Sequence, residues 1–358
     1  MSRDDLQPYD YTRPVRTAAD RDDPLFLELV STTAFKRLGD IRFLGGIDYF
    51  LVRHPNGAPG NRRYTRQQHS LGVARLADLY AEIVGLPQKD RRLVCSAALL
   101  HDVGHAPLSH TLEAVFKRSF GIDHHIAGSQ ILLGESPLGR EITDILLSYG
   151  LDPEEVLALA SGALNRFDGF FSGPINFDTI EGILRSWKYV RPKASAPSPD
   201  KVVFASINRA TGDDRATVDG FWQYKDYTYN YVVRSEFGVA SDFLCESVVF
   251  SNISRLSRSD YFLTEKQLFG KVPELRELFM NFRWRAGVTR GSARSIPYKA
   301  RRFSVDHRFD FFSRNDRCRY TQRREDRVME IPDPVIAGEL PQPRFPAFID
   351  DLDLHQDN

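Results

Sequence analysis

Residues 99–110 read LLHDVGHAPLSH, and this stretch decides how the rest of the chain is interpreted. It places His101, Asp102, His105 and His110 within ten residues, whereas the whole chain of 358 residues has only nine histidines. Imidazole and carboxylate groups together are suitable ligands for a divalent transition metal. Because an apolar segment precedes the histidines, we expect a metal site at the end of a buried helix.

A helix over residues 88–103 is expected to carry His101 and Asp102 to its end. Adjacent side chains on a helix point about 100° apart, so both reach one ion only if the helix axis is aimed at the site. Gly104 and Pro107 break the helix directly after the pair, which suits that geometry.

Helical periodicity recurs along the chain and predicts a mainly α fold. The short apolar and aromatic run from Ile47 to Val52 is expected to be extended or a strand. The segment 204–221 is ambiguous. The expected helices cover residues 25–45, 66–84, 88–103, 109–118, 123–134, 138–149, 153–163, 177–188 and 224–250, and one more starts near Thr264.

The composition is that of an ordinary globular protein, with 42% apolar and 27% charged residues. A net charge of +0 argues against a chain that binds nucleic acid or membranes through overall charge. Three widely spaced cysteines without a CxxC pair disfavour a thiolate zinc site and a disulfide framework, which fits a reducing cytoplasm. No long apolar run or secretory segment is present, so we expect a cytoplasmic protein without a membrane span.

Four regions are expected. A lead-in covers residues 1–24, a helical core covers 25–280, a basic mixed region of loops and short strands covers 281–345, and an acidic tail covers 346–358. Residues 281–330 hold thirteen arginines and one lysine against six acidic residues, a local net charge of +8.

Three segments supply candidate metal ligands. His69 lies near the start of an expected helix, His101 and Asp102 end another, and Asp178 begins a third. Two imidazoles and two carboxylates leave open positions on an octahedral ion for water and a phosphate oxygen. His105 would lie beside the ion, suited to orienting phosphate oxygens or transferring protons.

The pattern of Arg66-x-x-His69, then HDVGHAPLSH from His101, then an isolated Asp178 resembles the HD-domain metal-dependent phosphohydrolases. It is most similar to the sterile-alpha-motif-and-HD-domain deoxynucleoside triphosphohydrolases and their bacterial relatives. The resemblance extends upstream to residues 35–45 and, more weakly, downstream to about residue 270.

This resemblance implies that the metal ligands are His69, His101, Asp102 and Asp178. The cofactor it implies is one divalent transition metal, with iron, manganese, nickel and zinc all open, and Mg²⁺ on the substrate phosphate as an addition. A homo-oligomer is implied in the same way.

The resemblance also assigns residues to the reacting phosphate. Arg66 matches an arginine that contacts phosphate oxygens, and His105 and His125 match residues near the scissile phosphate, with His125 as the general acid. His110 matches a further active-site histidine, and Glu113 replaces a shorter acid that relays protons.

Several substrate-recognising positions differ from the family pattern. In the relatives, a Lys, a Tyr and an Asp hold the triphosphate and the sugar. This chain has Thr179, Gly182 and Ser186 at those positions. A glutamine that recognises the sugar 3′-hydroxyl is replaced by Phe43. The motif therefore specifies the reaction better than the substrate.

Three functions are kept open. The first is a metal-dependent phosphohydrolase that cleaves a phosphate ester of a nucleotide-like substrate, with a (deoxy)nucleoside triphosphate as one candidate. The second is an HD-type nuclease or phosphodiesterase on single-stranded nucleic acid or on a modified or cyclic nucleotide. Two features favour it: residues 281–330 interleave arginine with aromatic residues, and Gly182 leaves room for a longer substrate. That region could equally be a solvated or subunit-contacting surface. The third is a non-catalytic HD-fold binding module.

Overall fold

The computed structural model of the chain describes residues 23–51, 64–208, 211–281, 283–285, 293–309, 319–332 and 339–341. Most of the expected lead-in, the acidic tail and the loop around His54 lie outside the described residues. The boundaries of the four expected regions stay a prediction.

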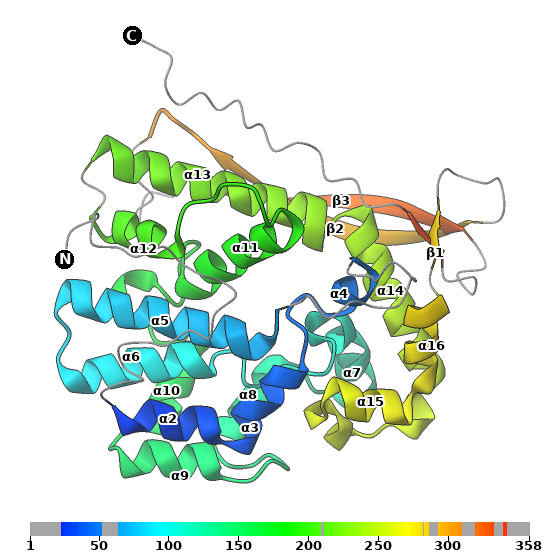
Figure 1. Cartoon of the computed structure of the whole chain (residues 1–358), viewed down its shortest axis with the longest axis horizontal. Helices are drawn as coiled ribbons and strands as arrows, with labels where there is room; N and C mark the ends of the chain where they lie inside the picture. The colour runs from blue at the N-terminus through cyan, green and yellow to red at the C-terminus, as the bar shows by residue number, and fades with distance from the viewer. Residues whose placement is uncertain are drawn as a thin grey trace.

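Helices dominate the described chain, which confirms the mainly α prediction (Figure 1). The α-helices are α2 (Pro24–Ser31), α3 (Thr33–Arg37), α4 (Gly46–Leu51), α5 (Arg66–Val84), α6 (Gln88–Leu100), α7 (Glu113–Phe120), α8 (His124–Leu132), α9 (Glu141–Ser148), α10 (Pro153–Ala160), α11 (Phe177–Val190), α12 (Pro199–Asn208), α13 (Gly212–Thr228), α14 (Glu236–Ser251), α15 (Glu265–Lys271) and α16 (Pro273–Asn281). Single 3₁₀ turns connect several of them, including η3 (Ser109–Leu112), and η5 (Tyr229–Val233) is a π-helical turn.

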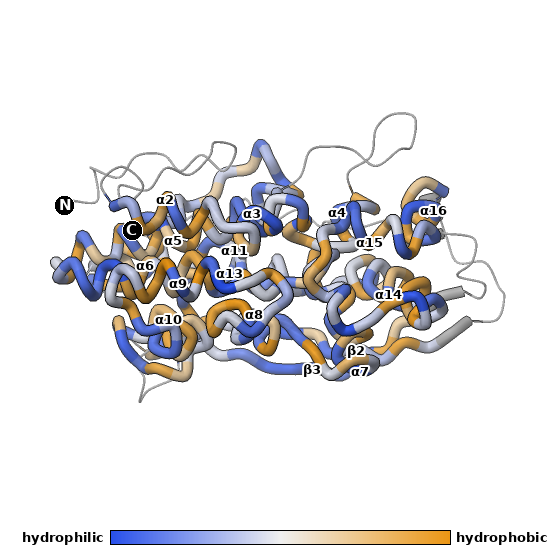
Figure 2. Tube along the Cα trace, turned by 90° about the horizontal axis from the view of Figure 1, so that it is seen from below, coloured by the Kyte–Doolittle hydropathy of each residue, from blue (hydrophilic) through white to orange (hydrophobic). Residues whose placement is uncertain are grey.

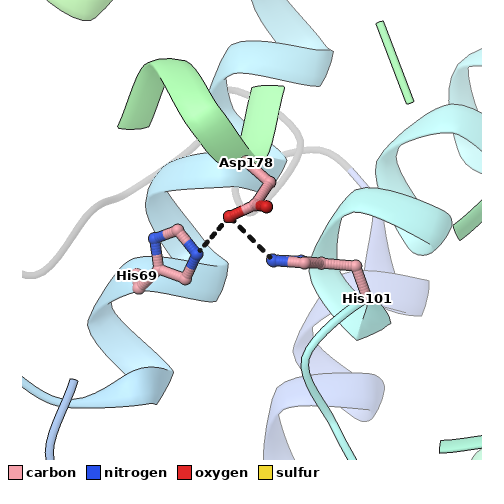
Figure 3. A group of neighbouring side chains, drawn as sticks. All are labelled: His69, His101 and Asp178. Carbon is pink, nitrogen blue, oxygen red and sulfur yellow. Dashed lines mark hydrogen bonds and ion pairs between the residues drawn. The ribbon is translucent and has the colours of Figure 1, made fainter. Parts of the chain in front are cut away.

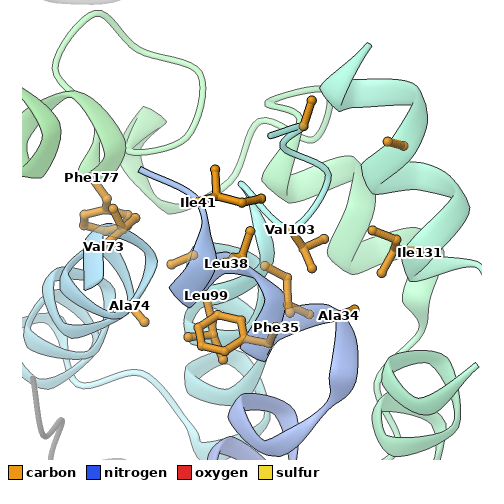
Figure 4. Close-up of a cluster of buried hydrophobic side chains, with 14 of the residues drawn as sticks. Ala34, Phe35, Leu38, Ile41, Val73, Ala74, Leu99, Val103, Ile131 and Phe177 are labelled. Carbon is orange, nitrogen blue, oxygen red and sulfur yellow. The ribbon is translucent and has the colours of Figure 1, made fainter. Parts of the chain in front are cut away.

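The core is built around the packed pair α5 and α6, against which the N-terminal helices lie (Figure 4). Phe35 and Leu38, with no exposed surface, meet Val73 of α5 and Leu99 of α6. A capping box at Thr65 begins α5, and Gly85 ends it in the left-handed conformation at φ 68°, as the sequence predicted. This pair therefore gives a rigid base to the residues at the start of α5 and the end of α6.

Helix α6 ends at Leu100, three residues earlier than predicted, so His101 and Asp102 lie in a turn. The reason is the approach of α8. A Cβ at Gly104 would lie 2.1 Å from the His124 carbonyl oxygen and 2.4 Å from the Gly128 nitrogen, so only glycine fits there. The chain must turn here to let the two backbones meet.

The prediction of a strand at Ile47–Val52 is wrong, because residues 46–51 form α4. A short buried apolar run has the same pattern as a strand or a helix, and tertiary packing decides between them. Here Tyr49 stacks on Phe279 of α16 at 4.2 Å between ring centroids, and Phe50 is fully buried. The Leu44 amide donates to the Asp48 carboxylate, which fixes the start of the helix.

The C-terminal part is more regular than predicted. Instead of short strands and loops, β2 (Ala293–Val305) and β3 (Tyr320–Pro332) pair antiparallel over 13 residues each, and β1 (Arg283–Arg285) pairs parallel with β4 (Glu339–Pro341). The hairpin β2–β3 lies along α13 and α14 (Figure 1). Phe303 and Tyr320 pack on Trp222 of α13, while much of β3 is hydrophilic (Figure 2). Trp284, Phe311 and Phe312 lie outside the residues whose side chains are described.

The ambiguous segment 204–221 belongs to α12 and α13. The helix expected over 224–250 is divided by η5, and Gly238 lies within α14. Among the described residues, no helix is both long and apolar enough to cross a membrane.

Candidate metal centre

His69 lies in the first turn of α5 and has no exposed surface. Its Nδ1 donates to Glu181 Oε2 at 2.5 Å, and Glu181 also accepts from the Arg185 guanidinium. Both Glu181 and Arg185 are fully buried. Because Nδ1 carries the proton, the Nε2 lone pair is directed to the other side, where Asp178 Oδ1 lies 3.1 Å away.

His101 follows the last residue of α6, and its Nδ1 donates to the Ala98 carbonyl at 2.8 Å. Its Nε2 is buried without a hydrogen-bond partner among the described residues. That atom lies 3.7 Å from Asp178 Oδ1 and 3.4 Å from Asp102 Oδ1. The imidazole is thus held in the tautomer that a metal ligand needs.

Asp178 comes from the start of α11, where Asn176 caps the helix through the Thr179 amide. Its side chain is 56% exposed, so the cluster is open on this side. Figure 3 shows the carboxylate between the two imidazoles. One ligand atom from each of His69, His101 and Asp178 lies within 4.8 Å of the others, which fits a divalent cation with two nitrogen ligands and one oxygen ligand.

Asp102 is buried against both imidazoles and against Arg66, which donates to its Oδ2 at 2.8 Å. Burial raises the pKa of Asp102, but His101, His105 and Arg66 outweigh it and hold the pKa well below the usual range. The carboxylate is therefore anionic. It lies beside the group of His69, His101 and Asp178 but is not one of that group's three members.

The two imidazoles are surrounded by negative charge. Burial lowers the pKa of His101, but Asp102 and Asp178 outweigh burial and raise the pKa to about 9. For His69, burial also lowers the pKa, and hydrogen bonds to Asp178 and Glu181 reverse this to a net increase. The carboxylates that favour protonated imidazoles here also favour a metal cation, which can take the place of the two protons.

A second group of candidate ligands lies beside the first. Glu113 accepts from His110 Nδ1 at 2.9 Å and from His124 Nδ1 at 2.6 Å. Burial raises the pKa of Glu113, yet these hydrogen bonds hold it well below the usual range. We call these three residues the His–Glu–His cluster.

His105 links the two groups. It is buried, its Nε2 lies 3.0 Å from Asp102 Oδ1, and its ring stacks on that of His124 at 4.8 Å and 3°. Burial and the Arg66 charge lower the pKa of His105 well below the usual value, so the imidazole is neutral.

His125, which the family pattern singles out, is exposed, and it is its neighbour His124 that hydrogen-bonds to Glu113. The His125 ring lies 3.9 Å from that of His124, and both line one cavity. The structure thus brings both histidines to the site.

The backbone before the His–Glu–His cluster is strained. Leu108 and Ser109 have φ angles of 60° and 52°, which side-chain-bearing residues rarely adopt. This turn sets Ser109 Oγ 2.9 Å from Arg66 Nε and lets it donate to the Arg42 carbonyl. The strain therefore orients Arg66 toward Asp102.

Two cavities flank the metal centre and share Arg66, His110 and Asp178 as walls. The first, about 260 Å³, also reaches His101, His124 and His125. The second, about 170 Å³, is walled by apolar and hydroxyl side chains: Phe43, Ile47, Ile183, Thr111, Thr228 and Ser186.

Glu181 and Arg185 are functional candidates that sequence reasoning missed. They stand four residues apart on α11, on the face that also buries Ile180 and Leu184. A Glu–Arg pair on an otherwise apolar helix face was the available signal, because such charges are almost never fully buried unless they are paired.

Comparison with known proteins agrees with this geometry: residues 66–193 match the family model described as HD domain. This part of the chain is therefore similar to HD domains. Outside that range the described helices and hairpin extend the HD domain at both ends.

Curated relatives are similar over limited stretches. The uncharacterized protein YwfO of Bacillus subtilis is 35% identical over 141 residues, 38% of this chain and 30% of the relative. The deoxynucleoside triphosphate triphosphohydrolase SAMHD1 of Gallus gallus is 31% identical over 182 residues, 48% of this chain and 26% of the relative. The matched part is less than a third of the length of either relative.

Among solved structures, a phosphohydrolase from Bacteroides thetaiotaomicron aligns with a TM-score of 0.54 and 16% identity, over 76% of this chain and 68% of that one. At this identity the likeness concerns the fold. It extends well beyond residues 66–193, so the architecture around the HD domain is shared too.

Proposed function

We propose that this chain is a metal-dependent phosphohydrolase that cleaves a phosphate ester of a nucleotide-like substrate. The observation that carries the proposal is the convergence of His69, His101 and Asp178, with both imidazoles held through Nδ1, next to Arg66 and a second histidine cluster. The similarity to SAMHD1, named as a deoxynucleoside triphosphate triphosphohydrolase, supports the substrate class.

His69, His101, Asp102 and Asp178 would hold the metal, which when bound supplies Lewis-acid activation of water and of a phosphoryl oxygen. Any of iron, manganese, nickel and zinc suits this donor set, and a Mg²⁺ ion on the substrate phosphate is compatible with it.

Arg66 would offset negative charge on the phosphate as the transition state forms, because its guanidinium is already oriented by Asp102 and Ser109. Neutral His105 would donate or accept a hydrogen bond at the phosphate without adding charge. These groups bind and orient the phosphate.

The leaving oxygen needs a proton. His110 and His124 both donate Nδ1–H to anionic Glu113, so the Nε2 atom of each is available for proton transfer. His125 remains the family-based prediction for the general acid, and it lines the same cavity. We assign proton delivery to the histidines His110, His124 and His125, with Glu113 as the relay.

The cavity bordered by Phe43 and Ile47 would take the organic part of the substrate, because it joins the metal centre and has both apolar and hydroxyl walls. Thr179, Gly182 and Ser186 stand where relatives have larger substrate contacts, so a substrate other than a deoxynucleoside triphosphate fits as well. A homo-oligomer remains a prediction.

The test is a screen of nucleoside triphosphates, cyclic nucleotides, short oligonucleotides and a chromogenic phosphodiester with Mn²⁺, Fe²⁺, Ni²⁺ and Zn²⁺, with phosphate or product release as the readout. We expect turnover that is lost on chelation and in His101→Ala. Absence of turnover with all metals, or equal turnover in His101→Ala, would contradict the proposal and favour a binding module.

A further inference from the structure

A separate cleft of about 440 Å³ lies between α14 and the hairpin β2–β3, at the side where these elements run next to each other (Figure 1). Four cations line it: Arg234 after η5, Lys299 and Arg301 on β2, and Arg324 on β3. The function proposed above uses none of them.

Two acidic groups of α14 face these cations but neutralise them only in part. Burial raises the pKa of Asp242 to about 6 and that of Glu246 to about 7, while Arg234 opposes both shifts. Near neutral pH, Glu246 is therefore about half protonated. The cleft keeps a positive charge.

The arginines of the cleft have no carboxylate within ion-pair distance among the residues that the structure describes. Arg301 instead lies over the Tyr229 ring at 5.1 Å. Arg324 is exposed, and Arg234 is half-buried. A guanidinium without an acidic partner is a ready receptor for phosphate, because its planar donors match phosphate oxygens.

Aromatic side chains accompany the charges. Tyr298 and Phe243 also line the cleft, one from the hairpin and one from α14. Unstacked bases bind to aromatic faces next to a basic groove, whereas an isolated phosphate gains nothing from them.

The cleft shares a wall with the cavity beside the metal centre. Asp242 lines both the cleft and the cavity beside Asp178, and it accepts from Thr111 of η3 at 2.7 Å. Tyr229 is a wall of that same cavity and contacts Arg301 of the cleft. Asp242 and Tyr229 therefore stand between the cleft and the cavity beside the metal centre.

We propose that this cleft binds the phosphodiester backbone of a single-stranded nucleic acid whose scissile phosphate lies at the metal centre. The inference rests on the proposed phosphohydrolase function and names its substrate class. In the reaction, a water oxygen forms a bond to phosphorus and the P–O ester bond breaks. The leaving oxygen takes a proton from the histidine group, and the proton lost by the water restores that group.

A mononucleotide would leave the cleft unused, because the cavity beside Asp178 already provides space for one organic unit. A strand would use both features of the cleft, its cations and its aromatic side chains. Gly182 agrees with this, since a Cβ there would approach Phe43 to 3.5 Å and narrow the same cavity.

The test measures fluorescence anisotropy of labelled oligo-dT and oligo-U of about 12 nucleotides, a length in the range that single-strand sites cover. It is done with the full chain in EDTA and low salt, so that binding is measured without hydrolysis. The double variant Arg234→Gln/Arg324→Gln is compared with Arg323→Gln, which removes an exposed arginine next to Arg324 that is not a wall of the cleft.

We expect the wild-type chain and Arg323→Gln to bind alike, and the double variant to bind about tenfold more weakly, with a salt dependence reduced by roughly one phosphate contact per arginine. Absence of binding at about 100 µM wild-type protein would overturn the inference. So would an equal loss in Arg323→Gln, or displacement of the probe by a mononucleotide at the same concentration.

Hydrolysis of bis(4-nitrophenyl) phosphate with Mn²⁺ is measured on the same variants. Ester hydrolysis without strand binding would overturn the inference alone and leave the proposed function in place. Loss of ester hydrolysis with every metal, together with strand binding, would overturn the proposed function and the cleavage part of the inference.

Discussion

The metal centre and the His–Glu–His cluster contain the same residue types but differ in where the acids lie. At the metal centre, Glu181 holds His69 through Nδ1, and a different acid, Asp178, faces Nε2. In the cluster, Glu113 accepts hydrogen bonds from Nδ1 of both His110 and His124. The rings of these two histidines lie against each other and line a cavity.

Because of this difference, we expect the two groups to do different chemistry although they contain the same residue types. Acids on the Nε2 side create a place for a cation, whereas imidazoles held only through Nδ1 are free to transfer protons. Burial follows the same division, since the His69 side chain is 0% exposed and that of His110 is 60% exposed. The predictions below are ways to separate the two groups.

The largest effect is expected at the metal centre. His101→Ala removes a ligand, so bound metal should be lost and turnover should fall by roughly a thousandfold or more. Metal analysis and product release measure both, and circular dichroism checks the fold. His307→Ala, an exposed histidine of the hairpin region, is the matched control. Full turnover by metal-checked His101→Ala would remove the distinction between the two groups.

In the His–Glu–His cluster, Glu113→Gln should reduce kcat by roughly a hundredfold or more, because His110 and His124 lose the anion that orients them. Metal content should stay at the wild-type level. A variant that loses metal and activity together would place Glu113 in the metal centre instead.

A finer comparison concerns the adjacent histidines. His124→Ala and His125→Ala should both fold, and the one that supplies the proton should lose kcat by roughly a hundredfold on a substrate with a poor leaving group. The loss should be smaller for a leaving group that needs no proton, such as 4-nitrophenolate. Equal effects on both substrates would contradict proton delivery by this group.

Glu181→Gln should weaken metal binding by about 10- to 100-fold, because the amide no longer supports the His69 tautomer with a charge. Isothermal titration with Mn²⁺ gives the affinity. Glu82→Gln, which changes an exposed glutamate near the other end of α5, is the matched control. Unchanged affinity in Glu181→Gln would show that the contact only packs the core.

The smallest effect is a pH dependence. Because the pKa of metal-free His101 is raised to about 9, the imidazole holds a proton at neutral pH, and a metal must displace it. Metal affinity should therefore keep rising, by up to about tenfold per pH unit, between pH 7 and 9. Affinity that levels off near pH 6.5 would indicate an ordinary, unpaired imidazole.

Much of the fold and of the site could be predicted from sequence, where local pattern decides the outcome. The amphipathic helix ending at Gly85 and the start of a helix at Asp178 are examples, since caps and periodicity are local signals. The candidate ligands His101 and Asp102 could be named from the sequence because they stand in one motif.

Other features depend on contacts between distant segments. Residues 46–51 form a helix because they pack on α16, and α6 ends early because α8 approaches Gly104. The partnership of Glu181 with His69 joins residues 112 positions apart, and no local pattern predicts such a pairing. The long hairpin was hidden because the run from Gln322 to Arg327 in β3 is polar or charged throughout and lacks the alternation typical of a strand.

The most direct test of the central claim is a titration of chelator-treated protein with Mn²⁺, followed by calorimetry, for the wild type and for His101→Ala. The account predicts one tightly bound ion per wild-type chain and none in the variant, with phosphate-ester hydrolysis restored only where the ion binds. Equal binding in the two proteins, or hydrolysis without bound metal, would contradict it.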